Sequence, residues 1–492
     1  MADLLLAIDQ GTTGSTAVLL DPSLEVLGTA TEDFPQIYPK PGWVEHAPEA
    51  IWASVCVAMR RLIEKTGVDP RRIAALGITN QRETTVVWDR ASGAPIANAI
   101  VWQCRRTRDA CQALREAGHE ATIRERTGLV LDPYFSATKI AWLLDNVPNA
   151  RARAEAGALA FGTIDTYLTW RLTGGAAHVT DISNASRTSL MDLRSGAWDD
   201  ELATLFRVPQ TLLPRIVGNA EIVGETRGLD FLPDGIPIAG MAGDQQAALF
   251  GQACFAPAQA KCTYGTGAFL LMNTGTTPVR SEHGLLTTAA WRLQGETTYA
   301  LEGSAFVAGA VVQWLRDELH FFTRSEDISA MAASVPDSAG VVLVPAFTGL
   351  GAPHWNPDAR GVLWGLTRGT QRAHIARAAL EGIAFQCYDI LRAMEQDLGH
   401  PLQIVRVDGG ASRNDLLMGF QAGLLNVPLS RPTMTETTAL GAALLAGLGV
   451  GLYDSLDAIE ARWREDARFL PTMTPDARGA HLARWAEGLR RV

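Results

Sequence analysis

The sequence predicts an α/β protein that contains two similar lobes. Each lobe is marked by a strand–turn–strand segment, one over residues 4–20 and the other over residues 260–272, in which a short Gly/Thr turn joins two apolar runs. In addition, a strand pattern changes to a helix pattern at two acidic residues, Asp244 and Asp408. Ligands of open α/β sheets bind at such strand ends. We therefore expect the two lobes to hold a nucleotide between them.

Length and composition agree with a large globular protein. The chain has 492 residues, of which 47% are hydrophobic and 20% are charged, and this composition excludes disorder. The net charge is −10, from 43 Lys+Arg and 53 Asp+Glu, which argues against binding to nucleic acid or to an anionic membrane surface. A nucleotide stays compatible with this charge, because backbone amides and a divalent cation can hold its phosphates. We place the lobe boundary near residue 252, which gives lobes of 1–252 and 253–492.

Cysteine spacing and terminal segments predict the compartment. The six cysteines form no C-x-x-C pair, so we expect reduced thiols and neither a disulfide framework nor a zinc site. The N-terminus has no basic segment of a signal peptide. The most apolar late stretch, residues 439–453, is too short and too glycine-rich to span a bilayer. We therefore expect a cytoplasmic protein with no integral membrane segment.

The first lobe opens with a predicted hairpin. Its strands cover residues 4–8 and 16–20, and its turn covers residues 9–15. This turn is not a P-loop, because it has neither the required lysine nor a following helix. The other expected elements of this lobe are strands over 73–79 and 84–88 around a polar loop at 80–83, helices over 105–117 and 139–144, and a strand over 236–243 that leads into a helix over 245–250.

The second lobe repeats this layout. A strand over 260–264, a turn at 265–267 and a returning strand over 268–272 correspond to the opening hairpin. Later, a strand over 404–407 ends in a glycine-containing turn at 408–415 that leads into a helix. We interpret the two hairpins as one weak internal repeat between the lobes.

Several of these segments have a functional and an ordinary interpretation. Residues 11–15 could present backbone N–H groups and hydroxyls to a phosphate, and Asp9 could hold a hydrated Mg²⁺ beside it, but an ordinary hairpin turn fits equally well. Thr266, between two glycines, has the same two interpretations. The pair Gly409–Gly410 could let a flat adenine ring approach the backbone.

Polar and aromatic residues of the first lobe are equally ambiguous on their own. Arg82 and Glu83 could bind neighbouring hydroxyls of a polyol, although the residues alone favour a surface turn with a local ion pair. Isolated aromatics such as Trp102 are more often core residues than ligand contacts. Asp244 could act as a general base or as a helix N-cap. Zinc-hydrolase, serine-hydrolase and protein-kinase motifs are absent from the sequence.

Taken together, these motifs resemble those of the FGGY carbohydrate kinases. The resemblance covers residues 4 to about 450 and rests on three short segments and two long signatures. The short segments are Asp9–Thr13, Gly243–Gln246 and Tyr264–Gly267, and the signatures are Tyr134–Asn146 and Gly361–Glu381. Within the family, Asn80–Thr84, Val101–Thr107 and Asn184–Thr188 are similar to members that phosphorylate glycerol.

The resemblance implies a two-lobe actin-like (ribonuclease-H-like) ATPase fold with an interlobe cleft. It implies ATP-dependent phosphorylation of glycerol to sn-glycerol 3-phosphate, with Asp244 as the general base, in a homodimer or homotetramer. By this resemblance glycerol would be hydrogen-bonded by Arg82, Glu83, Tyr134, Asp244 and Gln245, and would pack on Trp102 and Phe269. ATP would contact Thr12, Thr13, Gly14, Thr266, Gly309, Gln313, Gly410 and Asn414, with Asp9 and Asp244 near Mg²⁺.

Two alternatives stay open beside this interpretation. A sister kinase could act on a pentulose or another polyol, and a non-catalytic actin-like protein could bind a nucleotide without a polyol. One departure from the family concerns the nucleotide, because Gly14 and Thr16 stand where relatives commonly have Ser and Arg. A charged contact to the nucleotide is therefore expected to be missing.

Overall fold

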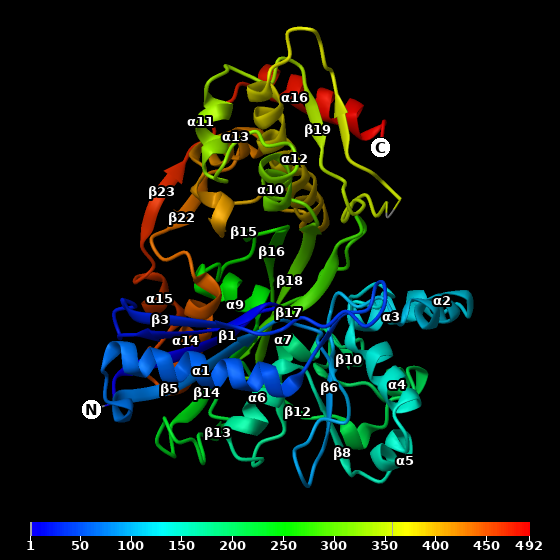
Figure 1. Cartoon of the computed structure of the whole chain (residues 1–492), viewed down its shortest axis with the longest axis vertical. Coiled ribbons are helices and arrows are strands. Elements are labelled where there is room, and N and C mark those ends of the chain that lie inside the picture. Colours follow the sequence, from blue (N-terminus) through cyan, green and yellow to red (C-terminus); the bar gives the residue numbers. More distant parts are fainter. Residues whose placement is uncertain (1, 357) are drawn as a thin grey trace.

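Two mixed β-sheets, one above the other along the long axis of the molecule, organise the chain (Figure 1). The structure is a computed structural model and describes residues 2–356 and 358–492. The first sheet has six strands in the order β13-β14-β5-β1-β2-β3, and the second has seven in the order β17-β18-β16-β15-β21-β22-β23. Helices pack on both sheets, so the predicted α/β class with two lobes is confirmed.

The first sheet brings three strand ends to one edge. Strand β1 is antiparallel to β2 but parallel to β5, which is in turn parallel to β14. In this register Asp9 and Ala242 both lie beside Thr79, so the chain leaves β1, β5 and β14 at the same level. The strands are β1 (Leu4–Gln10), β2 (Gly14–Leu20), β3 (Val26–Asp33), β5 (Ile73–Asn80), β13 (Gly224–Glu225) and β14 (Pro237–Gly243).

The second sheet has the same core arrangement. Strand β15 is antiparallel to β16 and parallel to β21, as β1 is to β2 and β5. Both predicted hairpins are therefore confirmed, and so is their correspondence. The strands are β15 (Gln259–Tyr264), β16 (Ala268–Gly275), β17 (Leu286–Leu293), β18 (Glu296–Ala305), β21 (Ile404–Asp408), β22 (Leu429–Pro432) and β23 (Glu465–Phe469).

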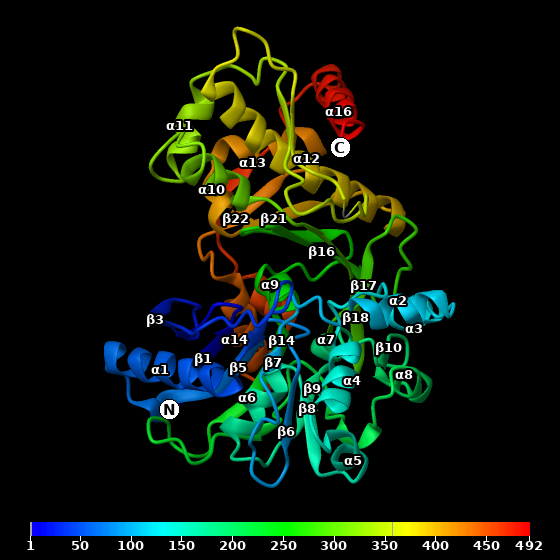
Figure 2. The same cartoon turned by 45° about the vertical axis from the view of Figure 1, so that its right-hand side comes forward.

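Helices give each sheet its hydrophobic core. Helix α1 (Pro48–Thr66) packs on β2 and β3 through an apolar stripe that includes the buried residues Ile51, Val55 and Leu62. Helices α12 (Arg372–Leu398) and α13 (Asp415–Leu425) cover the upper side of the second sheet (Figure 2). The opposite side of that sheet is turned toward the first lobe.

Helix α14 (Thr437–Gly449) comes from the last part of the chain but packs on the first sheet. It contacts β1, β5, β14 and helix α9 (Asp244–Gly251). The approach is close, because a Cβ atom at Gly77 or Gly240 would lie 2.2 or 2.6 Å from the carbonyl oxygen of Ala442. Glycine is therefore required at both strand positions. The division of the sequence into lobes at residue 252 stays a prediction.

One predicted pairing is wrong. Residues 84–88 were expected to return beside the strand over 73–79, but β6 (Val86–Asp89) pairs with β8 (Leu159–Gly162) in a separate two-stranded sheet. The reason is local, because Glu83 has a left-handed φ of 62° and the Thr84 N–H donates to the Arg82 carbonyl at 2.7 Å. This tight turn directs the chain away from the sheet.

Two other expectations concern the cysteines and membrane-spanning segments. All six cysteines are free thiols, and five of them are buried. Within residues 2–356 and 358–492, no helix has the length and the hydrophobicity that crossing a membrane requires.

Candidate functional site

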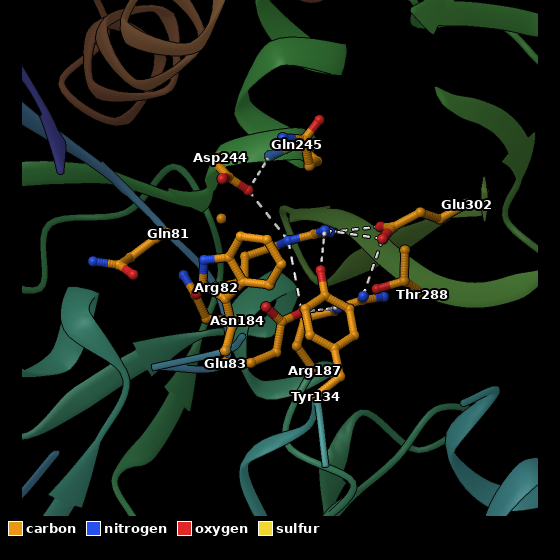
Figure 3. A network of polar contacts seen from close by, with 12 residues as sticks. Gln81, Arg82, Glu83, Tyr134, Asn184, Arg187, Asp244, Gln245, Thr288 and Glu302 are labelled. Atoms are coloured by element: carbon orange, nitrogen blue, oxygen red, sulfur yellow. Dashed lines mark hydrogen bonds and ion pairs between the residues drawn. The ribbon is translucent and has the colours of Figure 1, made fainter. Parts of the chain in front are cut away.

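The three coincident strand ends of the first sheet carry the acidic and basic residues of the candidate site. Asp9 lies near the end of β1, Arg82 and Glu83 follow β5, and Asp244 begins α9 directly after β14. The Oδ1 atom of Asp244 lies 3.2 Å from the Nε atom of Arg82 (Figure 3). Oδ1 also accepts a 2.7 Å hydrogen bond from the backbone N–H of Gln245. Asp244 is thus the first residue of its helix. The N-cap position belongs to Gly243, which has no side chain that could cap the helix.

Burial changes the acidity of both carboxyl groups. Burial, together with the nearby carboxylates of Asp244 and Glu436, raises the pKa of Asp9 to about 7. Burial also raises the pKa of Asp244, although the positive charges of Arg82 and Lys261 oppose this shift. An added cation would relieve the repulsion around Asp9.

Arg82 and Glu83 belong to a buried network of four alternating charges (Figure 3). Arg82 donates from Nη1 to Glu302 Oε2 at 2.5 Å and from Nη2 to Glu302 Oε1 at 2.9 Å. Arg187 donates from Nη2 to Glu302 Oε1 at 3.0 Å and from Nε to Glu83 Oε1 at 2.7 Å. The side chains of all four are at most 3% exposed. The interpretation of Arg82 and Glu83 as a surface turn is therefore wrong.

Opposite charges allow these groups to stay ionised in the interior. Charged side chains are expensive to bury unless they are paired and hydrogen-bonded. Burial alone would raise the pKa of Glu302, but Arg187 and Arg82 lower it to about 2. The pKa of Glu83 is raised, because burial outweighs the effect of the same two arginines. Glu302 is thus firmly ionised, and Glu83 depends on its cationic neighbours for its charge.

Two aromatic residues adjoin this network. The rings of Trp102 and Tyr134 meet edge to face, with their centroids 5.6 Å apart. The Tyr134 hydroxyl accepts a 3.4 Å hydrogen bond from Arg82 Nη2, and Trp102 Nε1 donates to Thr12 Oγ1 at 3.0 Å. The structure therefore places these rings beside Arg82 and the first hairpin, rather than deep in a hydrophobic core.

The second sheet contributes the other side of the site. Phe269 on β16 lies opposite Ser304 on β18, two residues from Glu302, so Phe269 and Glu302 share one face of the sheet. Lys261 on β15 is buried and donates from Nζ to the Gln245 side chain and, at 2.9 Å, to Thr263 Oγ1. Gln245 therefore contacts the second lobe directly.

The residues expected to bind the nucleotide gather in two places. Thr12, Thr13 and Gly14 form the turn of the first hairpin, where a Cβ atom at Gly14 would lie 2.6 Å from Asp33 Oδ1. The turn of the second hairpin contacts the start of helix α10 (Gly309–Asp317), because Gly309 N–H donates to the Gly265 carbonyl at 2.9 Å. Thr266, Gly309 and Gln313 therefore lie on neighbouring segments.

The remaining two residues lie after β21, next to the second hairpin. Gly409 has a φ of 83°, and a Cβ atom there would lie 2.5 Å from the Tyr264 carbonyl oxygen, so this turn packs tightly on the end of β15. Gly410 is exposed, and the Asn414 side chain caps α13 by accepting a 3.1 Å hydrogen bond from the Leu417 N–H. The structure thus brings all five second-lobe residues to one end of the second sheet.

Sequence reasoning missed three charged residues of this site as functional candidates. Arg187 is inside a segment that resembles the family, but no role was assigned to it. Lys261 and Glu302 were not singled out at all, although each follows an apolar residue within a strand and is itself charged. A charge at a buried strand position is unusual, and this is the signal that could have identified both.

Comparisons with known proteins agree with this geometry. Residues 4–251 match the N-terminal domain of the FGGY family of carbohydrate kinases, and residues 260–450 match its C-terminal domain. The chain is 58% identical to a glycerol kinase of Myxococcus xanthus over 493 residues, covering 100% of this chain and 99% of that protein. It is 59% identical to a glycerol kinase of Aromatoleum aromaticum over 488 residues, covering 99% and 98%.

Solved structures of two kinases are similar to this chain over nearly its whole length. The glycerol kinase of Plasmodium falciparum, solved with ADP, has a TM-score of 0.94 at 38% identity and covers 99% of this chain and 98% of its own. A gluconate kinase of Lactobacillus acidophilus has a TM-score of 0.88 at 23% identity, with coverage of 99% and 97%, and so shares the fold. The two-lobe actin-like fold that the resemblance implied is confirmed.

Proposed function

The chain belongs to the FGGY family of carbohydrate kinases, and from this premise we propose that it transfers the γ-phosphoryl group of ATP to glycerol. The products are sn-glycerol 3-phosphate and ADP. The observation that carries this proposal is the identity of 54% or more, over essentially the whole chain, to proteins named glycerol kinase. The charged and aromatic site between the two sheets supports it, because it offers both hydrogen bonds and an apolar surface.

Glycerol would bind where the strand ends of the first sheet meet the second sheet. Its hydroxyls would bond to Arg82, Glu83, Tyr134, Asp244 and Gln245, and its carbons would pack on Trp102 and Phe269. This combination suits a small polyol, because each hydroxyl needs both a donor and an acceptor in a buried site.

Asp244 would act as the general base. Its Oδ1 atom is held by the Gln245 N–H and Arg82, whereas Oδ2 makes no hydrogen bond within the described part of the chain. Oδ2 is therefore free to accept the proton of the attacking hydroxyl as its bond to phosphorus forms. Phosphoryl transfer has a loose transition state, so catalysis depends mainly on positioning and on neutralising charge.

The nucleotide would lie between the two hairpin turns. Backbone N–H groups and hydroxyls of the first hairpin, at Thr12, Thr13 and Gly14, would face the phosphates. On the second lobe, Thr266 would face the phosphates, and the nucleoside would rest on the α10 and α13 side. The second-lobe contacts are Gly309, Gln313, Gly410 and Asn414.

Mg²⁺ would enter with the nucleotide, held by Asp9 and Asp244. Burial, and after it the carboxylates of Asp244 and Glu436, raise the pKa of Asp9, and these neighbouring acidic groups favour a cation beside it. Among the described residues, no group of three or more His, Cys, Asp or Glu side chains forms a metal site. This fits Mg²⁺, which commonly takes one or two carboxylates and completes its shell with phosphate oxygens and water. When bound, it would neutralise charge on the transferred phosphoryl group.

One assay tests the proposal against its alternatives. ADP release is measured with Mg²⁺ and ATP in the presence of glycerol, xylulose, gluconate or no acceptor. We expect turnover with glycerol that exceeds turnover with the other acceptors and without one. Faster turnover with xylulose or gluconate would indicate a sister kinase of the family. Turnover that is absent or independent of the acceptor would favour an actin-like nucleotide-binding module. A homodimer or homotetramer stays the expectation for the assembly.

A further inference from the structure

Arg82, Glu83, Arg187 and Glu302, which we call the charge ring, form a closed circuit of opposite charges (Figure 3). Its four links are Arg82–Glu302, Glu302–Arg187, Arg187–Glu83 and the longer Glu83–Arg82 approach of 3.8 Å. Two of its members, Arg82 and Glu83, are expected to touch glycerol. The other two, Arg187 and Glu302, have no assigned role.

The ring leaves Arg82 few free donors. Its Nε faces Asp244, Nη1 donates to Glu302 and Gln246, and Nη2 donates to Glu302 and Tyr134. A guanidinium has five N–H donors in a fixed fork, so its orientation is set by Glu302 through two parallel bonds. A glycerol hydroxyl could displace the long 3.4 Å contact to Tyr134 without rotating the fork. Glu302 therefore determines the direction in which Arg82 can donate.

Arg187 orients the carboxylate of Glu83, as Glu302 orients the guanidinium of Arg82. It holds the Oε1 atom of Glu83 at 2.7 Å, which leaves Oε2 as the acceptor for a substrate hydroxyl. Glu83 itself has a left-handed backbone, a conformation that costs free energy for a residue with a side chain and that clusters at functional sites. Arg187 also lies over the Tyr134 ring, with its guanidinium carbon 5.6 Å from the centroid. One side chain thus contacts two expected glycerol ligands.

Arg187 also carries a donor without a protein partner. Its Nη1 atom is buried and has no hydrogen-bond partner within the described residues. This donor is therefore available to a water molecule or a ligand group. The ring also joins the lobes, because Glu302 lies on β18 of the second sheet while Arg82 and Glu83 follow β5 of the first.

We propose that Arg187 and Glu302 are positioning residues that act through Arg82 and Glu83 to set the affinity for glycerol. This inference rests on the proposed function and names the groups that make its substrate pocket. Glu302 fixes the fork of Arg82, and Arg187 fixes the carboxylate of Glu83 and keeps it ionised. Neither Arg187 nor Glu302 is among the residues expected to bind the nucleotide.

Single variants test each half of the proposal. Glu302→Gln keeps the shape but removes the charge that holds the Arg82 fork, and Arg187→Gln removes the partner of Glu83. We expect the KM for glycerol to rise about tenfold to a hundredfold in each, as for the loss of a charge-assisted hydrogen bond. The KM for ATP should change less than twofold. Arg187→Lys, which retains the charge, should recover part of the loss.

Arg377→Gln is the matched control. Arg377 forms a 2.9 Å ion pair with Glu381 within α12, in which both side chains are also largely buried. Its loss should leave both KM values unchanged. If either ring variant raises the KM values for glycerol and ATP equally, the role of its residue is merely structural and the proposal fails. If the KM for glycerol stays at the wild-type value in folded Glu302→Gln and Arg187→Gln, the proposal also fails.

Two further readouts separate positioning from general damage. The double variant Arg187→Gln/Glu302→Gln removes one charge of each sign, so its effect on the KM for glycerol should be smaller than the product of the single effects. An effect equal to that product would contradict the coupling.

In Arg187→Gln the KM for glycerol should also rise toward acidic pH, because Glu83 loses the cation that keeps it ionised. A flat profile there would exclude that role for Arg187. The charged or titratable groups facing Glu83 are Arg82, Arg187, Glu302, Tyr134 and Lys139.

The test stays informative if one variant is unstable. Thermal melting identifies an unfolded Arg187→Gln protein, and Arg187→Lys and Glu302→Gln then decide the question. Failure of the proposed function has a different signature, because the wild-type protein itself would then not prefer glycerol in the acceptor panel. A wild-type preference for glycerol combined with unaffected ring variants would overturn this inference alone.

Discussion

Replacing Asp244 with asparagine tests the proposed mechanism most directly. The hydrogen bond to Oδ1 is preserved, because an amide oxygen can still accept from the Gln245 N–H at 2.7 Å. The 3.2 Å ion pair between Oδ1 and Arg82 Nε loses its negative partner. Burial already disfavours the carboxylate and raises the pKa of Asp244, so a neutral side chain should not lower the melting temperature. What is lost is the carboxylate, which is proposed to accept the proton at Oδ2 and to hold Mg²⁺ together with Asp9.

The smallest expected effect follows from the loss of the base alone. A positioned general base contributes about 10²–10⁴-fold to the rate, which corresponds to about 3–5 kcal/mol of the activation free energy at 1.36 kcal/mol per factor of ten. We therefore expect the kcat of Asp244→Asn to fall by about two to four orders of magnitude. Binding of ADP without Mg²⁺ should stay close to that of the wild-type protein.

The assay combines coupled ADP release, calorimetric titration with ADP and thermal melting. Asp165→Asn is the matched control, because Asp165 is another buried acid in the first turn of a helix, α6 (Ile164–Leu172), and burial raises its pKa to about 7. This control should keep the wild-type kcat. A near-normal kcat in Asp244→Asn would refute its assignment as the base. A fall in kcat that is matched by lost ADP binding and a lower melting temperature would refute the argument that the fold is preserved.

Three further predictions follow from single contacts. Arg82→Lys should raise the KM for glycerol about tenfold or more while leaving the KM for ATP unchanged. Lysine keeps the charge but cannot bridge both oxygens of Glu302. Equal effects on the two KM values would contradict this prediction. Thr16→Arg should lower the KM for ATP about two- to fivefold. Position 16 lies opposite Asp9 in the hairpin, and the substitution restores the arginine that relatives commonly have there. An unchanged KM for ATP would show that the missing charge is compensated. His46 is buried, and burial lowers its pKa to about 4. Because the unfolded chain binds this proton at about pH 6.5 and the folded chain does not, the free energy of unfolding should fall by about 3 kcal/mol between pH 6.5 and pH 4. Urea denaturation at both pH values should show a smaller fall for His46→Gln, and an equal fall would place the acid sensitivity elsewhere.

Local patterns predicted much of the fold. The two hairpins and the strand before Asp244 were recovered because apolar runs and Gly/Thr turns are visible within about ten residues. The pairing of residues 84–88 was not recovered, because it depends on the left-handed backbone of Glu83. Glutamate gives no sequence signal for that conformation.

The candidate site could be predicted only in part, for a related reason. Residues alone favoured a surface turn at Arg82, and only the resemblance to a family moved it into a pocket. The structure buries Arg82 through Glu302, which is 220 residues away along the chain. Arg187 reaches Glu302 across 115 residues. Such pairs depend on how the two sheets face each other, and no local pattern carries that information.

The position of α14 has a consequence for how the protein is made. This helix ends at Gly449, near the end of a chain of 492 residues, yet it covers β1, β5 and β14, and β1 begins at Leu4. During synthesis one apolar face of the first sheet therefore stays uncovered until residues 437–449 have left the ribosome. The strand glycines Gly77 and Gly240, which admit the helix so closely, also leave that face without side chains that could shield it meanwhile. Chains that terminate before residue 437 should consequently aggregate or require a chaperone, even though they contain every residue of the proposed glycerol pocket.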